Sequence, residues 1–189
     1  MRAPLEKTAE RLAEPFRTLL GHFRHEIGHY YWMYFAQSEA WLAAFRRHFG
    51  DDQQDYGAAL NRYYANGPTS DWAASFVSAY ATLHPWEDWA ESWAHYLHMI
   101  DTLETAYSFG LTVDPRIGNR DHLTQTVRFD AYKQVDFDAL ITTWVPVTIA
   151  VNSLNRSMGE ADLYPFVLTQ PVIDKLTFIH NIIRQGSPR

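Results

Sequence analysis

The fold of this chain follows from one stretch near its start, Leu20-Gly21-His22-Phe23-Arg24-His25-Glu26-Ile27-Gly28-His29-Tyr30-Tyr31-Trp32. We predict that the stretch is helical and note that its central pentad, H-E-I-G-H, has the pattern H-E-x-x-H. Four residues are slightly more than one helical turn, so the imidazoles of His25 and His29 project from the same face and can bind one metal ion. Glu26 lies beside that face, where a carboxylate can reach a water on the metal.

This set of side chains suits zinc. Two neutral imidazoles and one carboxylate are typical zinc ligands, and they leave the fourth tetrahedral position open to water. Sites of this kind hydrolyse amide bonds. The pentad alone leaves another interpretation open, namely a helix with two ordinary histidines and a surface glutamate.

A candidate third ligand lies in a second predicted helix, which has Pro85 in its first turn. Its apolar residues recur every three or four positions, as on a packed helix face; they are Trp86, Trp89, Ala90, Trp93, Ala94 and Leu97. Glu87 and Glu91 lie one turn apart among these tryptophans, and a buried carboxylate needs a partner. We predict that Glu87 is the third ligand and that Glu91 accepts a hydrogen bond from a liganding histidine. The alternatives are that the two exchange roles, or that both merely solubilise the helix.

The pentad followed by an E-x-x-A-E-x-x-A helix resembles the gluzincin zinc peptidases, in which the third ligand is a glutamate on a later helix. Residues 21–32 and 89–98 also closely resemble a bacterial family of zinc-binding metallopeptidases, and the likeness runs through most of the chain. The resemblance implies a zincin-like fold with one Zn²⁺ per chain. It also favours Glu87 over Glu91, because the first glutamate of E-x-x-A is the gluzincin ligand.

The same resemblance suggests a role for Tyr80. Several toxin-like relatives have a tyrosine seven residues before the liganding glutamate, and Tyr80 has this position relative to Glu87. It is therefore a candidate donor to the oxyanion that forms during catalysis. Without the resemblance, Tyr80 is one of 11 tyrosines in the chain and is expected in the core.

The chain departs from the gluzincin pattern ahead of His25. Gluzincin domains usually build a small β-sheet before the active-site helix, and its edge strand holds the substrate backbone. The 24 residues before His25 are instead predicted to be helical. Either an N-terminal sheet belongs to an upstream part of a longer protein, or the segment between the two helices replaces it.

Composition sets further limits. The 189 residues are 47% hydrophobic and 15% aromatic, enough for a single domain with a large core. The formal charge of −6 and the lack of a basic run argue against nucleic acid and anionic membranes as partners. The most apolar stretch, 139–151, is shorter than a bilayer span. The absence of cysteine and of an N-terminal signal pattern is compatible with the cytoplasm.

We predict a mainly α fold with little or no β-sheet. The expected helices cover residues 4–13, 15–37, 38–49, 55–65, 85–110, 136–155 and 171–184. In the second helix, Phe16, Leu19, Leu20, Phe23 and Ile27 are predicted to form the buried stripe. Residues 69–83 are expected to form a loop beside the metal. His84 is expected to cap the helix that follows or to pack against it, and the alternative is that it faces the substrate.

Two functions remain in view at this stage. The first is a zinc-dependent peptidase acting on peptides or proteins, with His25, His29 and Glu87 on the metal, Glu26 as the acid and base, and Tyr80 at the oxyanion. The second is a metal-stabilised helical binding module without turnover. A digest of a peptide library with and without a chelator distinguishes them.

Overall fold

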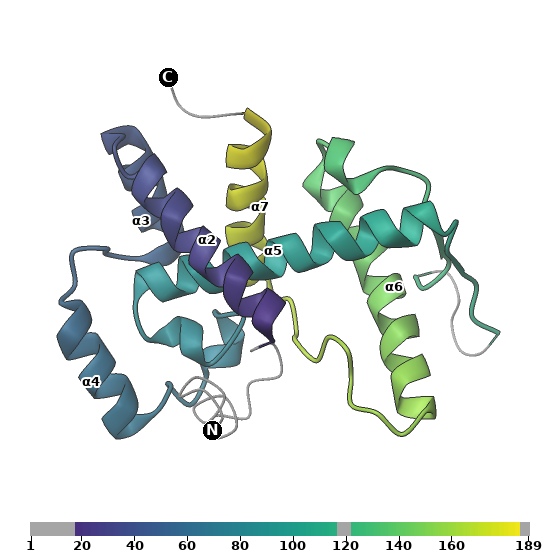
Figure 1. Ribbon diagram of the computed structural model, residues 1–189, viewed down its shortest axis with the longest axis horizontal. Helices are drawn as coiled ribbons and strands as arrows, with labels where there is room; N and C mark the ends of the chain where they lie inside the picture. Colours follow the sequence, from purple (N-terminus) through teal and green to yellow (C-terminus); the bar gives the residue numbers. More distant parts are fainter. Residues whose placement is uncertain (1–17, 117–121, 186–189) are drawn as a thin grey trace. The chain divides into compact units, whose positions relative to one another are not determined.

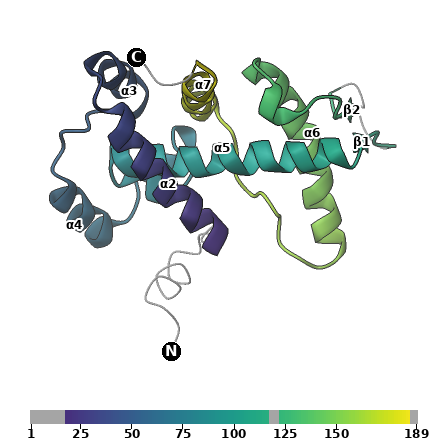
Figure 2. The same ribbon diagram turned by 45° about the horizontal axis from the view of Figure 1, so that its top comes forward.

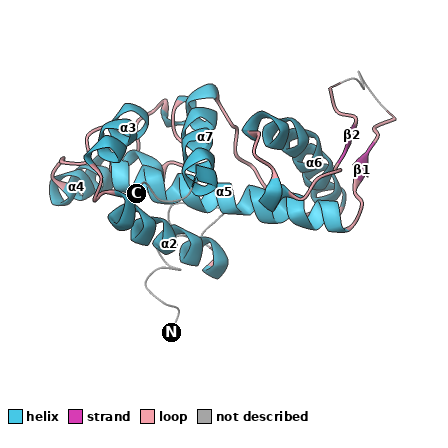
Figure 3. Cartoon of the chain, turned by 90° about the horizontal axis from the view of Figure 1, so that it is seen from above, coloured by secondary structure: helices cyan, strands magenta, loops and turns pink. Residues whose placement is uncertain are grey.

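The computed structural model describes residues 18–116 and 122–185, and these form a mainly α structure, as predicted (Figures 1 and 3). The chain divides into two compact units. Unit 1 comprises residues 1–96 and 166–189, and unit 2 comprises residues 97–165. The predicted helix over 4–13 and the predicted helix start at Pro15 lie outside the described residues.

Unit 1 contains five of the described helices, one of them only in part. These are α2 (Leu19–Phe35), α3 (Glu39–Phe49), α4 (Tyr56–Asn66), the N-terminal half of α5 (Pro85–Ser108) and α7 (Gln170–Gln185). Polar side chains begin three of these helices: Thr18, Ser38 and Asp55 each accept a hydrogen bond from a backbone N–H of the first turn. The helix boundaries follow the predicted ones closely.

Helix α2 crosses the N-terminal half of α5 at close range (Figures 1 and 2). A Cβ added at Gly28 would lie 3.0 Å from the Cα of Ala90 and 3.1 Å from the Cβ of Trp93, so the missing side chain is what allows this approach. The indole N–H of Trp89 donates to the carbonyl oxygen of Gly28 at 2.8 Å. Gly28 and Ala90 therefore set the distance between the two helices.

The predicted buried stripe of α2 is wrong at three positions; of its other two residues, Ile27 is half-buried and Phe16 lies outside the described residues. Leu19, Leu20 and Phe23 are 88%, 52% and 62% exposed. The helix instead buries Gly21, His25, Gly28 and Phe35. The reason is that α2 turns Gly28 and His25 toward α5, where close approach and the acidic partners of His25 decide its orientation. Leu19, Leu20 and Phe23 are left exposed, whereas Trp32 and Phe35 pack on aromatic rings of the core.

Aromatic rings fill the core of unit 1. Trp89 is fully buried and contacts rings from α2, α3 and α7, namely Phe35, Trp41, Phe45, Phe49 and Phe178. Rings in edge-to-face and offset arrangements add to the free energy gained from burying their area. This core fixes the first turns of α5, the part that carries Glu87 and Glu91.

A buried ion pair joins α7 to α5 in the same unit. Lys175 Nζ lies 2.7 Å from Asp88 Oδ2 and also donates to the carbonyl oxygen of Ser75 at 2.7 Å. Both charged side chains are almost wholly inaccessible. Removing one partner of such a pair is expected to destabilise strongly, since the other charge would remain buried.

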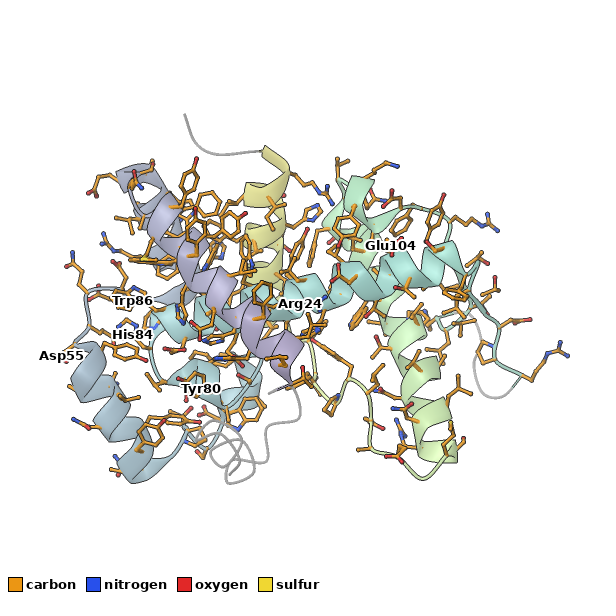
Figure 4. The ribbon with its side chains drawn as sticks, viewed as in Figure 1. Arg24, Asp55, Tyr80, His84, Trp86 and Glu104 are labelled. Atoms are coloured by element: carbon orange, nitrogen blue, oxygen red, sulfur yellow. The ribbon has the colours of Figure 1, made fainter. Side chains whose placement is uncertain are left out.

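The segment between α4 and α5 contains no α-helix and forms two short 3₁₀ turns, η1 (Trp72–Ala74) and η2 (Tyr80–Thr82). This agrees with the predicted loop. His84 caps α5 as predicted: its Nδ1 accepts from the backbone N–H of Trp86 at 3.1 Å, while its Nε2 lies 3.1 Å from the carbonyl oxygen of Gln54 (Figure 4).

Unit 2 consists of the C-terminal half of α5, a two-stranded antiparallel sheet and α6 (Phe137–Ser157). The strands are β1 (Thr112–Val113) and β2 (Gln125–Thr126), and a 3₁₀ turn, η3 (Ala131–Lys133), follows them. Asp136 caps α6, which begins where the predicted helix over 136–155 begins, and Pro146 lies inside α6. The Tyr132 hydroxyl donates to Asp101 of α5.

Helix α6 is long and apolar enough to cross a membrane, judged by length and composition alone. It extends beyond the apolar stretch 139–151, so the length of that stretch no longer excludes a span. A core helix of a water-soluble protein passes the same test, and residues such as Leu140, Trp144 and Val147 are buried within this unit.

Candidate metal centre

Three side chains predicted to bind a metal lie together in unit 1. His25 and His29 project from one face of α2, and Glu87 projects from the first turn of α5. One ligand atom from each of these residues lies within 4.8 Å of the other two. Four residues separate the histidines, and 58 separate His29 from Glu87, so the crossing of the two helices creates the cluster.

The distances among the three atoms fit a tetrahedral zinc ion. His25 Nε2 lies 3.1 Å from His29 Nε2 and 3.1 Å from Glu87 Oε2. His29 Nε2 and Glu87 Oε2 are 3.6 Å apart. Donor atoms about 2.0–2.2 Å from one tetrahedral ion lie roughly 3.3–3.5 Å from each other. Small adjustments of the side chains would therefore bring all three atoms onto one ion.

The buried oxygen of Glu87 also fits a cation. Among the described residues, no donor forms a well-aligned hydrogen bond with Oε2, although the two imidazoles lie close to it. Burial opposes the charge on Glu87, but the adjacent His25 and His29 and the hydroxyl of Tyr56 hold its pKa far below the usual range. Glu87 is thus a buried carboxylate with one oxygen directed at two imidazoles.

Glu91 lies one turn further along α5 and contacts the other side of His25. Its Oε1 is 2.7 Å from Nδ1 of His25, and its Oε2 accepts from the Ser78 hydroxyl at 2.6 Å. Burial opposes the charge on Glu91, but the pKa of this carboxyl is lowered, chiefly by His25. Since a carboxylate accepts from Nδ1–H, Nε2 of His25 is left for the metal.

The two carboxylates on either side of His25 favour the protonated form of its imidazole. Burial alone would lower its pKa, but Glu87 and Glu91 together raise the pKa of His25 to about 9. In the metal-free protein the imidazole is therefore protonated at neutral pH. A positive charge is thus favoured at this point of the structure, and a metal ion would supply one.

The two remaining predicted residues lie at the edge of the cluster. Glu26 is largely exposed, and its Oε1 lies 3.6 Å from Nδ1 of His22. Tyr80, in the turn η2, has its ring centroid 6.1 Å from that of His25 (Figure 4). Neither is part of the three-residue cluster.

Two residues at this site were not predicted. The Tyr56 hydroxyl donates to Glu87 Oε1 at 2.7 Å, and Ser78 donates to Glu91 as described above. Burial and the neighbouring Glu87 raise the pKa of Tyr56, so its hydroxyl stays protonated and remains a donor. Neither residue belongs to a motif. Tyr56 is 31 residues from Glu87, and only the packing of α4 against the start of α5 brings them together.

Comparison with known proteins gives a family for the chain. Residues 2–182 match the family described as "Putative zinc-binding metallo-peptidase". The chain is 45% identical over 184 residues to an uncharacterized protein of Mycobacterium bovis and to one of Mycobacterium tuberculosis. The match covers 97% of this chain and 51% of each relative, so the chain spans about half the length of the curated relatives it matches. No solved structure matches it significantly.

Proposed function

The chain belongs to the family described as putative zinc-binding metallo-peptidases, and we propose that it is a peptidase of the gluzincin type. In this proposal His25, His29 and Glu87 hold one zinc ion. The observation that carries the proposal is the convergence of two imidazole nitrogens and one carboxylate oxygen at 3.1–3.6 Å. Such a set of three protein ligands is typical of catalytic zinc sites, which keep one position open.

The contacts support one order of the two glutamates. Glu87 Oε2 faces both imidazoles, whereas Glu91 contacts His25 on the nitrogen that points away from His29. A ligand must reach the same point as the two Nε2 atoms, and Glu91 does not belong to the group that does. We therefore assign the metal to Glu87, and to Glu91 the orientation of His25.

The proposed reaction is hydrolysis of a peptide bond. Bound zinc would act as a Lewis acid that polarises the scissile carbonyl and lowers the pKa of a bound water. Glu26 takes the proton of the attacking water and delivers it to the leaving amine. Tyr80 donates a hydrogen bond to the carbonyl oxygen as it gains negative charge, an interaction worth about 3–4 kcal/mol where such a donor has been removed from other enzymes.

The substrate, the cellular location and the partners of the protein are proposals as well. We propose a peptide or protein substrate in the cytoplasm, with neither nucleic acid nor membrane as partner. The net charge of −6 and the absence of cysteine support this proposal. A substrate strand of the gluzincin kind would come from a further part of the protein, or the segment between α2 and α5 would replace it.

One observation favours a second candidate function, a metal-stabilised helical binding module without turnover. Within the described residues, strands pair only between β1 and β2, which belong to unit 2. Unit 1, which holds the metal ligands, therefore offers no described strand to bind a substrate backbone. In this second case the metal would stabilise the crossing of α2 and α5.

Glu26→Gln tests which of the two functions applies. The variant should hold about one zinc per chain, because Glu26 is not a ligand, yet its cleavage of a peptide library should fall by roughly 10²–10⁴-fold. Zinc content is measured by plasma emission spectrometry after dialysis, and cleavage by mass spectrometry with and without chelator. Cleavage by the variant at the rate of the original chain would remove Glu26 from the reaction. If neither the original chain nor the variant shows cleavage that the chelator abolishes, the result favours the binding module.

A further inference from the structure

We infer that Tyr56 is a positioning residue for the metal centre, which holds one oxygen of Glu87 so that the other oxygen is left for the metal. The inference rests on the proposed function, because it concerns the same zinc ligand. It adds a residue from a third helix, α4, which neither the sequence motifs nor the family description indicates.

The contacts divide the two oxygens of Glu87 between different partners. Oε1 accepts from the Tyr56 hydroxyl at 2.7 Å, and Oε2 lies 3.1 Å from His25 Nε2 and 3.6 Å from His29 Nε2. A free carboxylate rotates and offers either oxygen, or both, to a metal. A hydrogen bond on Oε1 fixes this rotation and favours binding through Oε2 alone.

The Tyr56 ring is itself held in place. It stacks on Trp86, with centroids 6.0 Å apart and an interplanar angle of 25°, and it meets the ring of His84 edge to face at 5.4 Å. His84 in turn contacts the carbonyl oxygen of Gln54, just before α4. Tyr56 therefore bridges the start of α4 and the start of α5, the turn that carries Glu87.

The rest of α4 supports this placement. Asp55 caps the helix through the N–H of Ala58, and the buried residues Ala59 and Tyr63 pack with Leu83 just ahead of α5. A hydrogen-bond donor held on such a packed element keeps its direction when the metal enters. The hydroxyl is neutral, so it orients Glu87 without cancelling the negative charge that attracts a cation.

Tyr56→Phe tests the inference, because it removes the hydroxyl and keeps the ring. The zinc affinity of the whole chain, measured by competition with a chromophoric chelator, should fall about 10–100-fold. Tyr64→Phe is the matched control: Tyr64 lies on the same helix, is 60% exposed, and its variant should bind zinc as the original chain does. Circular dichroism of the metal-free variants checks that both remain folded.

A second measurement separates positioning from a general effect on folding. If Tyr56 acts through Glu87, Tyr56→Phe should lower the weak residual zinc affinity of Glu87→Ala, measured by direct titration at high zinc concentration, less than about twofold, since coupled residues are not additive. A decrease in zinc affinity of about 10–100-fold in the presence of Glu87→Ala would overturn the inference. An unchanged zinc affinity in the Tyr56→Phe single variant would also overturn it. Either result would leave the proposed function standing, because it concerns only the role of Tyr56. If the original chain does not bind zinc, the proposed function and the inference both fail.

Discussion

The imidazole of His25 carries a proton in the metal-free protein, because the two adjacent carboxylates outweigh the effect of burial and raise its pKa to about 9. Because the folded pKa lies above 6.5, the ordinary value of an imidazole, this proton stabilises the fold fully below pH 6.5. The contribution is lost as the pH rises through 9. Zinc competes with the same proton, because a liganding imidazole must be neutral.

Zinc binding should therefore depend on pH. If one proton leaves His25, the apparent affinity should rise roughly tenfold per pH unit between pH 6.5 and 8. Calorimetric titration in two buffers of different ionisation enthalpy measures both the affinity and the number of protons released. Equal affinities at pH 6.5 and 8, with no proton release, would show that His25 is neutral before the metal enters.

The two glutamates of α5 should respond differently to substitution. Glu87→Ala should leave no stably bound zinc after dialysis, because it removes a ligand. Glu91→Gln should retain zinc with an affinity lowered about 10–100-fold, since it removes only the charge that orients His25. Zinc content and competition titrations measure both. If Glu87→Ala retained about one zinc per chain and Glu91→Gln retained none, Glu91 would be the ligand and Glu87 the residue that orients His25.

At the scale of elements, the crossing of α2 and α5 is what makes a site out of two separate motifs. Gly28 lies between the two histidines in sequence and against Ala90 and Trp93 in space. The contacts show that it makes room for α5. Helix spacing and ligand geometry are therefore set at the same position.

Gly28→Ala should separate the helices and weaken the site. The new methyl group would meet backbone at 3.0 Å, and overpacking of this kind costs about 1–3 kcal/mol, less the gain of up to about 1 kcal/mol in helix propensity. Urea denaturation should show lower stability, and zinc affinity should fall. Gly57→Ala in α4 is the control, since its methyl group would meet only a carboxylate oxygen of Asp55 at 3.3 Å. Equal stability of Gly28→Ala and the original chain would argue against a tight crossing.

At the scale of the whole molecule, the sequence predicts the helices well and their faces less well. Caps such as Ser38, Asp55 and Asp136 mark helix starts by local hydrogen bonding, and all three lie where expected. The predicted buried face of α2 differs from the observed one. Apolar periodicity predicts which face of a helix is buried only when burial of apolar area determines how the helix is oriented. In α2, Gly28 and the carboxylates facing His25 decide it instead.

The metal ligands could be predicted because their chemistry depends on local spacing within each helix. Tyr56 and Ser78 could not, because each reaches its glutamate through a tertiary contact that no spacing encodes. The sequence predicts a single domain, and the boundaries of the two compact units fall after Tyr96, inside the continuous helix α5, and after Pro165. The curated relatives are about twice as long as the matched region, so the activity of the whole protein remains a proposal.

A crystal structure of the zinc-loaded chain, with anomalous diffraction recorded at the zinc edge, tests the central claim most directly. The account predicts one anomalous peak about 2.0–2.2 Å from His25 Nε2, His29 Nε2 and Glu87 Oε2, with Glu91 still on Nδ1 of His25. A peak bound by Glu91 in place of Glu87, or the absence of zinc between α2 and α5, would contradict it.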